Sequence, residues 1–324
     1  MRIISKAPCR IVLFCGGTDV EPFSSRYGTT VLNMAINLRQ TVILTPRHDN
    51  KIQIITPGKM VSFIKDQIPN NDGRYDLFLQ IFRSYNFPRG FDLETTSDVG
   101  YHSGLGGSAA FTVATIGAIN RYLDIVQSRL DIAQKAQTME LHLGWVTGHQ
   151  DQIASVMGGI NYYQSHGFPT QVTTLRNGWE NLVDYFVLFS LGHRSPSDKI
   201  QQQLVKTMNS QKTIDSLTLI KQLADKAYHS LNKPVVIGEL LDESWKLRIA
   251  ANPISTNSFI DDIYKTALAN GAIGGKVMGA GGGGHMLFMC HPPKKHQVIT
   301  TLEKNGCRQV DFSIDLNGLE VRAL

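Results

Sequence analysis

The first third of the chain contains short runs of apolar residues that predict β-strands. These runs cover residues 11–14, 41–44 and 52–55, where β-branched side chains are frequent. Glycine, proline and asparagine bound the runs, as is typical of strands that end in turns. We therefore expect the chain to open with a β-sheet.

From residue 108 onward the apolar positions follow a helical period. The stretches 113–123 and 132–143 each predict a helix of about three to four turns. A polar and turn-rich segment, 164–181, follows them, and we place a domain boundary there. The apolar run at 185–191 then suits a buried strand.

The last third of the chain alternates helices and strands. Ser258 and Asp261 have the spacing of a capping box at the start of a helix, and Gly271 is placed to end that helix. Strands are expected at 275–278, 285–290 and 309–314. The pattern predicts an α+β fold with an N-terminal domain at 1–175 and a C-terminal domain at 176–324.

Composition narrows the class of protein. Of the 324 residues, 42% are hydrophobic and 18% are charged, which leaves enough apolar surface for a buried core. The net charge of +5 is compatible with anionic small ligands, but no dense basic stripe indicates nucleic acid. The four cysteines lack zinc-site spacing, so we expect buried, reduced thiols. No apolar run approaches the ~20 residues of a membrane span, and the run at 11–14 is too short for a signal peptide, so we expect a cytoplasmic protein.

Residues 103–110, Ser-Gly-Leu-Gly-Gly-Ser-Ala-Ala, directly precede the first expected helix. Glycines allow several backbone N–H groups to approach phosphate oxygens, and the helix adds the positive end of its dipole. The chain has no Walker A pattern. A dinucleotide-binding fingerprint fits the glycines, but residues 96–102 do not form the apolar strand that it requires. A kinase-type phosphate loop and a glycine turn without a ligand remain the alternatives.

A second glycine-rich segment, residues 276–284, lies between two expected strands. Its four consecutive glycines at 281–284 lose much conformational entropy when the chain folds. We therefore expect another backbone or a ligand to approach closely there, with a merely flexible turn as the alternative.

Four separated side chains have the chemistry that phosphoryl transfer needs. Glu140 lies on the inward face of an expected helix, Asp151 follows a turn at the start of another, and Arg10 lies on the first strand. Each alone is more often a surface or capping residue. Together, Glu140 and the Ser108 hydroxyl could hold Mg²⁺, Asp151 could accept the substrate proton, and Arg10 could supply a permanent positive charge.

Three separated motifs resemble those of the GHMP kinases, in the order found in that family. They are residues 7–10 leading to 16–19, residues 104–110, and residues 279–284. Within the family, the chain is most similar to the D-glycero-D-manno-heptose 7-phosphate kinases. That likeness rests on residues 16–20, 150–152, 158–161, 191–195 and 244–246.

The resemblance implies an N-terminal domain like ribosomal protein S5 domain 2, a ferredoxin-like C-terminal domain, and an active site between them. It implies ATP and Mg²⁺, with Ser108 and Glu140 at the metal and with Asp151 and Arg10 as catalytic residues. It places nucleotide binding at Gly104, Leu105, Gly106, Gly107, Ser108 and Ala109. It places substrate binding at Gly17, Thr18, Asp19, Arg194, Gly281, Gly282 and Gly283, with Lys276 as a further candidate for contacting anionic groups.

The function that the resemblance implies is phosphorylation of the anomeric hydroxyl of a heptose 7-phosphate. The expected partner is a small sugar or sugar phosphate, without nucleic acid or membrane, and a homodimer is left open. Another acceptor, such as a fucose-type sugar or a mevalonate-like acid, is one alternative, and a catalytically silent nucleotide or sugar sensor is another. Gly107 replaces a serine of the usual loop, and Cys15 stands near the presumed sugar site where the subgroup often has glycine.

Overall fold

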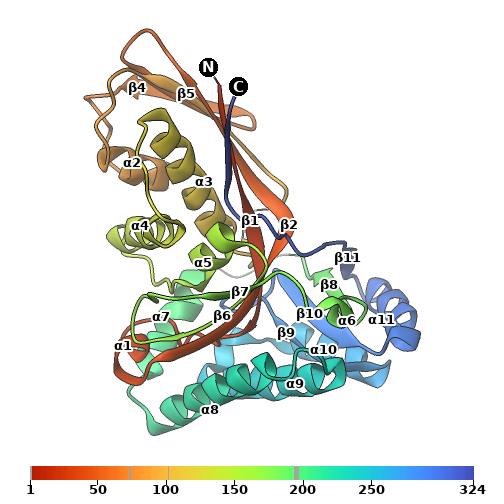
Figure 1. The fold of residues 1–324 in the computed structure, drawn as a ribbon. Coiled ribbons are helices and arrows are strands. Elements are labelled where there is room, and N and C mark those ends of the chain that lie inside the picture. The colour runs from red at the N-terminus through yellow and green to blue at the C-terminus, as the bar shows by residue number, and fades with distance from the viewer. Residues whose placement is uncertain (1, 72, 74, 101, 193–196) are drawn as a thin grey trace.

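The computed structural model describes residues 2–71, 73, 75–100, 102–192 and 197–324 (Figure 1). Within these residues the named strands form two sheets, and the helices pack against both. None of the described helices is long and apolar enough to cross a membrane. All four cysteines are buried with free thiols, as the sequence predicted.

The first sheet joins the start of the chain to its end. Its strands are β1 (Ile3–Phe14), β2 (Thr29–Pro46), β3 (Lys51–Thr56), β4 (Lys59–Ile64), β5 (Phe91–Ser97), β6 (Ile160–Ser165), β7 (Thr173–Leu175) and β12 (Glu320–Ala323). Their order is β12-β1-β2-β5-β3-β4, and β6 also pairs with β2 and carries β7. The neighbouring strands are antiparallel except β3 and β5. Because β12 pairs with β1, the two termini lie side by side (Figure 1).

The two parts of strand β2 differ in burial, which explains why the sequence pattern predicted only part of this strand. Residues 29–36 are all buried, whereas residues 37–46 mix buried and partly exposed positions. The first part pairs with β6 and the second with β5, while β1 runs along most of its length. Only 41–44 stood out in the sequence because polar residues interrupt the apolar pattern elsewhere.

Several helices pack against the first sheet or against one another. The helices of this part are α1 (Phe23–Tyr27), α2 (Asp76–Arg83), α3 (Gly107–Tyr122), α4 (Arg129–His142) and α5 (Gln150–Met157). Helices α3 and α5 pack directly on β1 and β2, and α4 packs on both helices. The helices predicted at 113–123 and 132–143 are therefore confirmed as α3 and α4.

The second sheet is antiparallel and has the order β11-β8-β10-β9. Its strands are β8 (Phe186–Ser190), β9 (Ala272–Val277), β10 (His285–Cys290) and β11 (Arg308–Val310). The remaining helices are α6 (Glu180–Val183), α7 (Ser197–Thr207), α8 (Gln211–Tyr228), α9 (Pro234–Ala251), α10 (Ser258–Ala269) and α11 (Pro292–Lys304), with the short 3-10 helix η1 (Pro253–Ser255). The order of strands and helices from β8 to β11 is that of a ferredoxin-like unit.

Helix α8 connects the two sheets. It packs against β1 and β2 of the first sheet and against α9, which itself lies on β9 of the second. The division between 175 and 176 falls between β7, in the first sheet, and β8, in the second. This division stays a prediction.

Two local predictions for the last third need correction. Helix α10 does not begin with a Ser258–Asp261 capping box, because Asn257 is the N-cap and its side chain accepts the Ile260 backbone N–H at 3.0 Å. Asp261 instead accepts a hydrogen bond from the hydroxyl of Thr256. The strand expected at 309–314 is the shorter β11, followed by an isolated bridge to the first sheet. Gly271 does follow the helix, with a positive φ of 111°.

Candidate active site

The segment predicted to bind phosphate, residues 104–109, runs into the N-terminus of α3 beside β1, and we refer to it as the phosphate loop. Gly104 and Gly106 have φ angles of 79° and 75°, which glycine adopts without strain. Gly106 is the N-cap of α3. The backbone N–H of Arg10 donates to the Leu105 carbonyl at 2.9 Å, which fixes the loop against the edge of β1. The free N–H groups and the dipole of a 16-residue helix therefore converge where the loop turns.

The residues around Gly106 also leave little space for a side chain at this position. A Cβ atom at this position would lie 3.2 Å from the Arg10 side chain and 3.3 Å from the Asp151 carboxylate. A larger residue would therefore crowd the pair of side chains that faces the loop.

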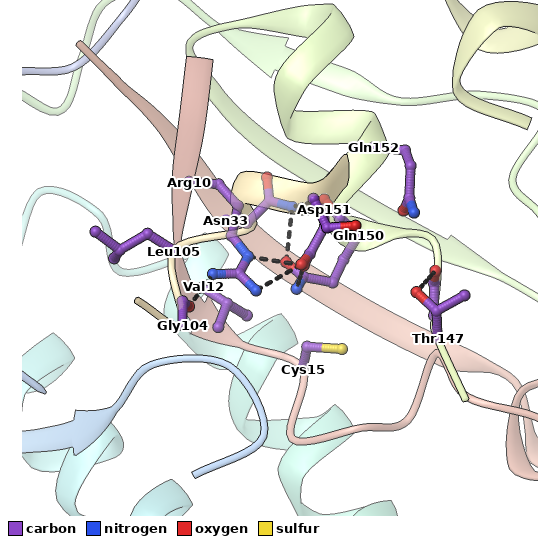
Figure 2. Close-up of polar contacts among 12 residues, drawn as sticks. Arg10, Val12, Cys15, Asn33, Gly104, Leu105, Thr147, Gln150, Asp151 and Gln152 are labelled. Atoms are coloured by element: carbon purple, nitrogen blue, oxygen red, sulfur yellow. Dashed lines mark hydrogen bonds and ion pairs between the residues drawn. The ribbon is translucent and has the colours of Figure 1, made fainter. Parts of the chain in front are cut away.

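Arg10 and Asp151 form a two-pronged ion pair at the centre of the site (Figure 2). The Nε and Nη2 atoms of Arg10 each donate to a different Asp151 oxygen at 2.7 Å. Arg10 is 3% exposed, whereas the Asp151 side chain keeps 26% of its surface in solvent. Arg10 also donates to the Gly104 carbonyl, so one guanidinium links the phosphate loop to the carboxylate. Of the two side chains, Asp151 is therefore the one that a bound molecule could reach.

Glu140 lies in a cage of three donors from three elements. The Ser108 hydroxyl donates to Oε1 at 2.6 Å, while Thr147 and the Gln152 amide donate to Oε2 at 2.9 and 2.8 Å. Glu140 is 4% exposed. Burial raises the pKa of Glu140 to about 7, and the Asp151 charge adds to that rise, while the three donors oppose it. The sequence predicted the inward direction of Glu140, and this is confirmed.

Asp19 is tied to the same helix that carries Asp151. Its Oδ2 atom accepts the backbone N–H groups of His149 and Gln150 at 3.0 and 3.1 Å. Its Oδ1 atom accepts the Cys15 thiol at 3.0 Å. Asp19 thus supplies a negative charge to the N-terminus of α5, which steadies the turn before Asp151. Burial and the Asp19 charge hold the pKa of the Cys15 thiol well above its usual value.

The rest of the first motif is packed tightly. Thr18 is fully buried and its hydroxyl lies 2.6 Å from that of Thr29. Gly17, with a φ of 91°, leaves no room for a side chain because a Cβ would meet Leu204 at 2.6 Å and Arg248 at 3.2 Å. Both residues lie on the turn that leads to Asp19.

The second glycine loop, residues 279–284, is held between the sheets. The Gly282 N–H donates to the Ser255 carbonyl at 2.8 Å. A Cβ at Gly281 would lie 2.4 Å from that same oxygen, so the close backbone approach that the sequence predicted is confirmed. At the end of the loop, a ring nitrogen of His285 lies 2.7 Å from the Ser103 carbonyl, next to the phosphate loop. The two glycine loops are therefore neighbours, and Gly282 and Gly283 are buried with Gly281.

A cavity of about 260 Å³ opens beside the start of the phosphate loop. Its lining includes Val99, His102 and Ser103 before the loop, and Ser190 and His285 from the second sheet. The cavity thus lies where the two sheets meet.

The structure brings together Arg10, Ser108, Glu140 and Asp151, as the sequence analysis expected. Gly107 and Ala109 lie in the first turn of α3. Arg194 lies outside the described residues. Lys276 is buried at the end of β9, and its ammonium donates to the Val12 carbonyl at 3.1 Å.

Sequence reasoning missed three of the side chains that hold the site. Gln152 and Arg248 are polar residues on otherwise buried helix faces, at 0% and 4% exposure. Their helical spacing with apolar neighbours was the signal that could have revealed them. Thr147 lies on a loop and carried no such signal.

Comparison with known proteins supports the same family. The model of the GHMP kinases N terminal domain matches residues 75–159, and that of the GHMP kinases C terminal domain matches residues 221–307. The two matches fall on opposite sides of the boundary segment. The expected two-domain α+β fold of this family is confirmed.

Individual relatives cover the chain almost completely. A D-glycero-alpha-D-manno-heptose 7-phosphate kinase from Campylobacter jejuni is 31% identical, with 98% of each chain covered. A mevalonate kinase from Thermococcus sibiricus is 28% identical, with 99% of this chain and 98% of the relative covered. The crystal structure of a D-glycero-D-manno-heptose 1-phosphate kinase from Bacteroides thetaiotaomicron has the same fold, with a TM-score of 0.81 at 24% identity and 99% of each chain covered.

Proposed function

Because this chain belongs to the GHMP kinase family, we propose that it transfers the γ-phosphate of ATP to the anomeric hydroxyl of D-glycero-D-manno-heptose 7-phosphate. The observation that carries the proposal is the convergence of Arg10 and Asp151 on the phosphate loop, with Glu140 and Ser108 beside them. The heptose acceptor is supported by the name of the relative at 31% identity.

Asp151 is suited to the role of base. It lies in the first turn of α5, it is the exposed member of the Arg10 pair, and its oxygens lie beside Gly106 of the phosphate loop. An acceptor hydroxyl that reaches Asp151 can pass its proton to the carboxylate as its oxygen attacks the γ-phosphorus of ATP. The bond from that phosphorus to the β-phosphate oxygen breaks, and ADP leaves. Arg10 orients Asp151 through its two hydrogen bonds to the carboxylate, and its guanidinium offsets negative charge near the transferred group.

The residues around Glu140 fit a divalent cation. A carboxylate and a hydroxyl are oxygen donors of the kind that Mg²⁺ prefers. No group of three or more His, Cys, Asp and Glu side chains that could hold a metal occurs among the described residues. This agrees with kinase sites, in which Mg²⁺ takes few protein ligands and completes its shell with phosphates and water. Glu140 and Ser108 would hold the ion, which would neutralise charge on the phosphates.

ATP would lie with its phosphates on the N-terminus of α3. The N–H groups of Gly106, Gly107 and Ser108 are available there because the first four N–H groups of a helix have no intrahelical partner. The neighbouring cavity at Val99 and His285 offers space for the nucleoside. GHMP kinases use ATP, and ATP is the phosphate donor in this proposal.

The turnover assay with a sugar panel tests this function. Purified protein is incubated with ATP, Mg²⁺ and heptose 7-phosphate, free heptose, fucose, galactose or mevalonate, and ADP is measured. We expect heptose 7-phosphate to give the highest kcat/KM. Turnover only with mevalonate or a free sugar would reject the proposed acceptor, and ADP release no faster than without any acceptor would reject the kinase in favour of a sensor.

A further inference from the structure

Two buried cations lie between the sheets and have no carboxylate as a hydrogen-bond partner in the described structure. Lys276 and Arg248 are each 4% exposed. The Lys276 ammonium donates to the Val12 carbonyl at 3.1 Å. Arg248 donates to the carbonyls of Gly16 and Ala280 at 2.8 and 3.1 Å. Both side chains therefore hold backbone oxygens, which carry no full negative charge.

The charge of Lys276 is the less compensated of the two. Burial lowers the pKa of Lys276 to about 7, and the positive charges of Arg248 and Arg10 act in the same direction. Arg10 is already matched by Asp151. Asp19 lies within electrostatic range of Arg248. The Cys15 thiol acts in the opposite direction on the pKa of Lys276, but burial raises the pKa of that thiol, so it does not supply a full negative charge.

An ammonium group without a counter-ion is costly to bury, and it has three donors to satisfy. Val12 accepts from one donor of Lys276, and no other hydrogen bond of this ammonium is found among the described residues. An anionic ligand would supply both the missing charge and the missing acceptors.

The position of Lys276 indicates which ligand. Its ammonium reaches from β9 to Val12, two residues beyond Arg10 on β1. Arg248 extends the positive charge away from Arg10, toward the Gly16 turn and the second glycine loop. The proposed function places the nucleotide at the phosphate loop and Glu140. Lys276 and Arg248 instead contact the first motif, where the proposed function places the acceptor.

Unpartnered polar atoms border the same region. The hydroxyl of Ser255 and the side-chain oxygen of Asn252 are buried without a hydrogen-bond partner in the described structure. Ser255 lies against Gly281, and Asn252 follows Arg248 by one helical turn. A polar ligand, rather than an apolar one, suits these surroundings.

We propose that Lys276, with Arg248 behind it, binds the anionic substituent of the acceptor and makes the enzyme select a phosphorylated sugar over the same sugar without phosphate. The inference rests on the proposed function, and it identifies the side chains that would give that function its substrate class. Lys276 is then a specificity-determining residue, while Asp151 and Arg10 act on the transferred group.

The test compares Lys276→Met with wild type on two acceptors, heptose 7-phosphate and the unphosphorylated heptose. The matched control is Lys246→Met, which removes an exposed lysine paired with Asp242 on α9. We expect kcat/KM for heptose 7-phosphate to fall by about 10- to 100-fold in Lys276→Met, as for loss of one charged hydrogen bond. The value for free heptose and the KM for ATP should change less than about threefold, and Lys246→Met should match wild type.

Other outcomes overturn the inference. Equal losses with both acceptors would mean that Lys276 acts on the transferred phosphoryl group, and no loss with either would remove it from the site. A merely structural role would lower the thermal unfolding temperature, whereas removing an unpaired buried charge is expected to leave it unchanged or raise it.

If the proposed function is wrong, a binding measurement still tests the role of Lys276. If wild type turns over neither acceptor, calorimetric titration with heptose 7-phosphate in the absence of ATP still tests the subsite. Binding by wild type that is lost in Lys276→Met and kept in Lys246→Met would support the inference, and equal binding or no binding by all three proteins would overturn it.

Discussion

Gly148 lies where any larger residue would collide with Asp19. A Cβ atom at Gly148 would lie 1.9 Å from the Oδ2 atom of Asp19 and 2.2 Å from its Cγ atom. The same Oδ2 atom accepts the N–H groups of the next two residues, His149 and Gln150. Gly148 does not have a positive φ angle. The substitution Gly148→Ala therefore tests the contact with Asp19 and not the backbone conformation.

The expected effect follows from how far the carboxylate must move. Real Cβ contacts shorter than 3.0 Å are essentially never seen, so Asp19 or the turn must shift by at least about 1 Å. That shift breaks or weakens two hydrogen bonds to a charged group, each contributing about 1.5–3 kcal/mol. With partial relaxation, we expect a loss of about 2–4 kcal/mol in the free energy of unfolding. Because the turn carries Asp151, a misplacement of about 1 Å should lower kcat by about 100-fold.

Urea unfolding and the ADP assay with heptose 7-phosphate measure the two effects on one preparation. Glu303→Ala is the control, because Glu303 is an exposed residue of α11 and does not line the cavity beside the phosphate loop. A Gly148→Ala protein with the stability and kcat of wild type would refute the argument that Asp19 positions α5. Loss of stability with an unchanged kcat would refute only the link from Asp19 to Asp151.

Three further predictions follow from the same geometry. Asp151→Asn should lower kcat by about 100-fold or more with little change in the KM for ATP, and a near-normal kcat would remove Asp151 as the base. Gln152→Leu should weaken the apparent affinity for Mg²⁺ about tenfold, because Glu140 loses one orienting donor. Electron paramagnetic resonance measures this with Mn²⁺ in place of Mg²⁺, and an unchanged affinity for Mn²⁺ would contradict the prediction. The pKa of Lys276 is lowered from 10.5 to about 7 in the folded protein, so the unfolded chain binds more protons between these values and wild-type stability should rise with pH across them. Lys276→Met should lack that contribution, and equal slopes in urea unfolding of the two proteins at several pH values in this window would contradict it.

Local sequence was sufficient where local interactions decide the structure. Helices α3 and α4 carry their own apolar period, and α4 begins with a capping box at Ser128. The glycines of the phosphate loop indicated a turn because few other residues adopt the φ angles of Gly104 and Gly106. Glu140 and Asp151 could be identified as candidates because each is an acidic residue on a helix that the local pattern predicts.

The sequence pattern did not predict strand pairs and hydrogen bonds whose second partner comes from a distant segment of the chain. Strand β1 begins at Ile3, but the sequence pattern predicted a strand only at residues 11–14. Its polar residues Ser5 and Arg10 interrupt the local apolar pattern, and contacts with distant segments bury them. β12 joins the first sheet by pairing with residues more than 300 positions away, and no local signal specifies that pairing. Arg248 holds the Gly16 carbonyl 232 positions away for the same reason.

The cap of α10 shows a different limit. Asn257 and Ser258 are both good N-cap residues, and the sequence offers Asp261 to either of them. The choice of Asn257 leaves Asp261 to accept from Thr256, a contact that depends on the backbone path before the helix. A rule based on spacing alone cannot separate the two arrangements.

Phosphorus and proton magnetic resonance of the reaction products shows directly whether the protein phosphorylates the anomeric hydroxyl. Wild-type protein is incubated with ATP, Mg²⁺ and heptose 7-phosphate until ADP appears. The expected product is a second sugar phosphate whose phosphorus couples to the anomeric proton. Only inorganic phosphate, or a new phosphate coupled to another sugar proton, would contradict it.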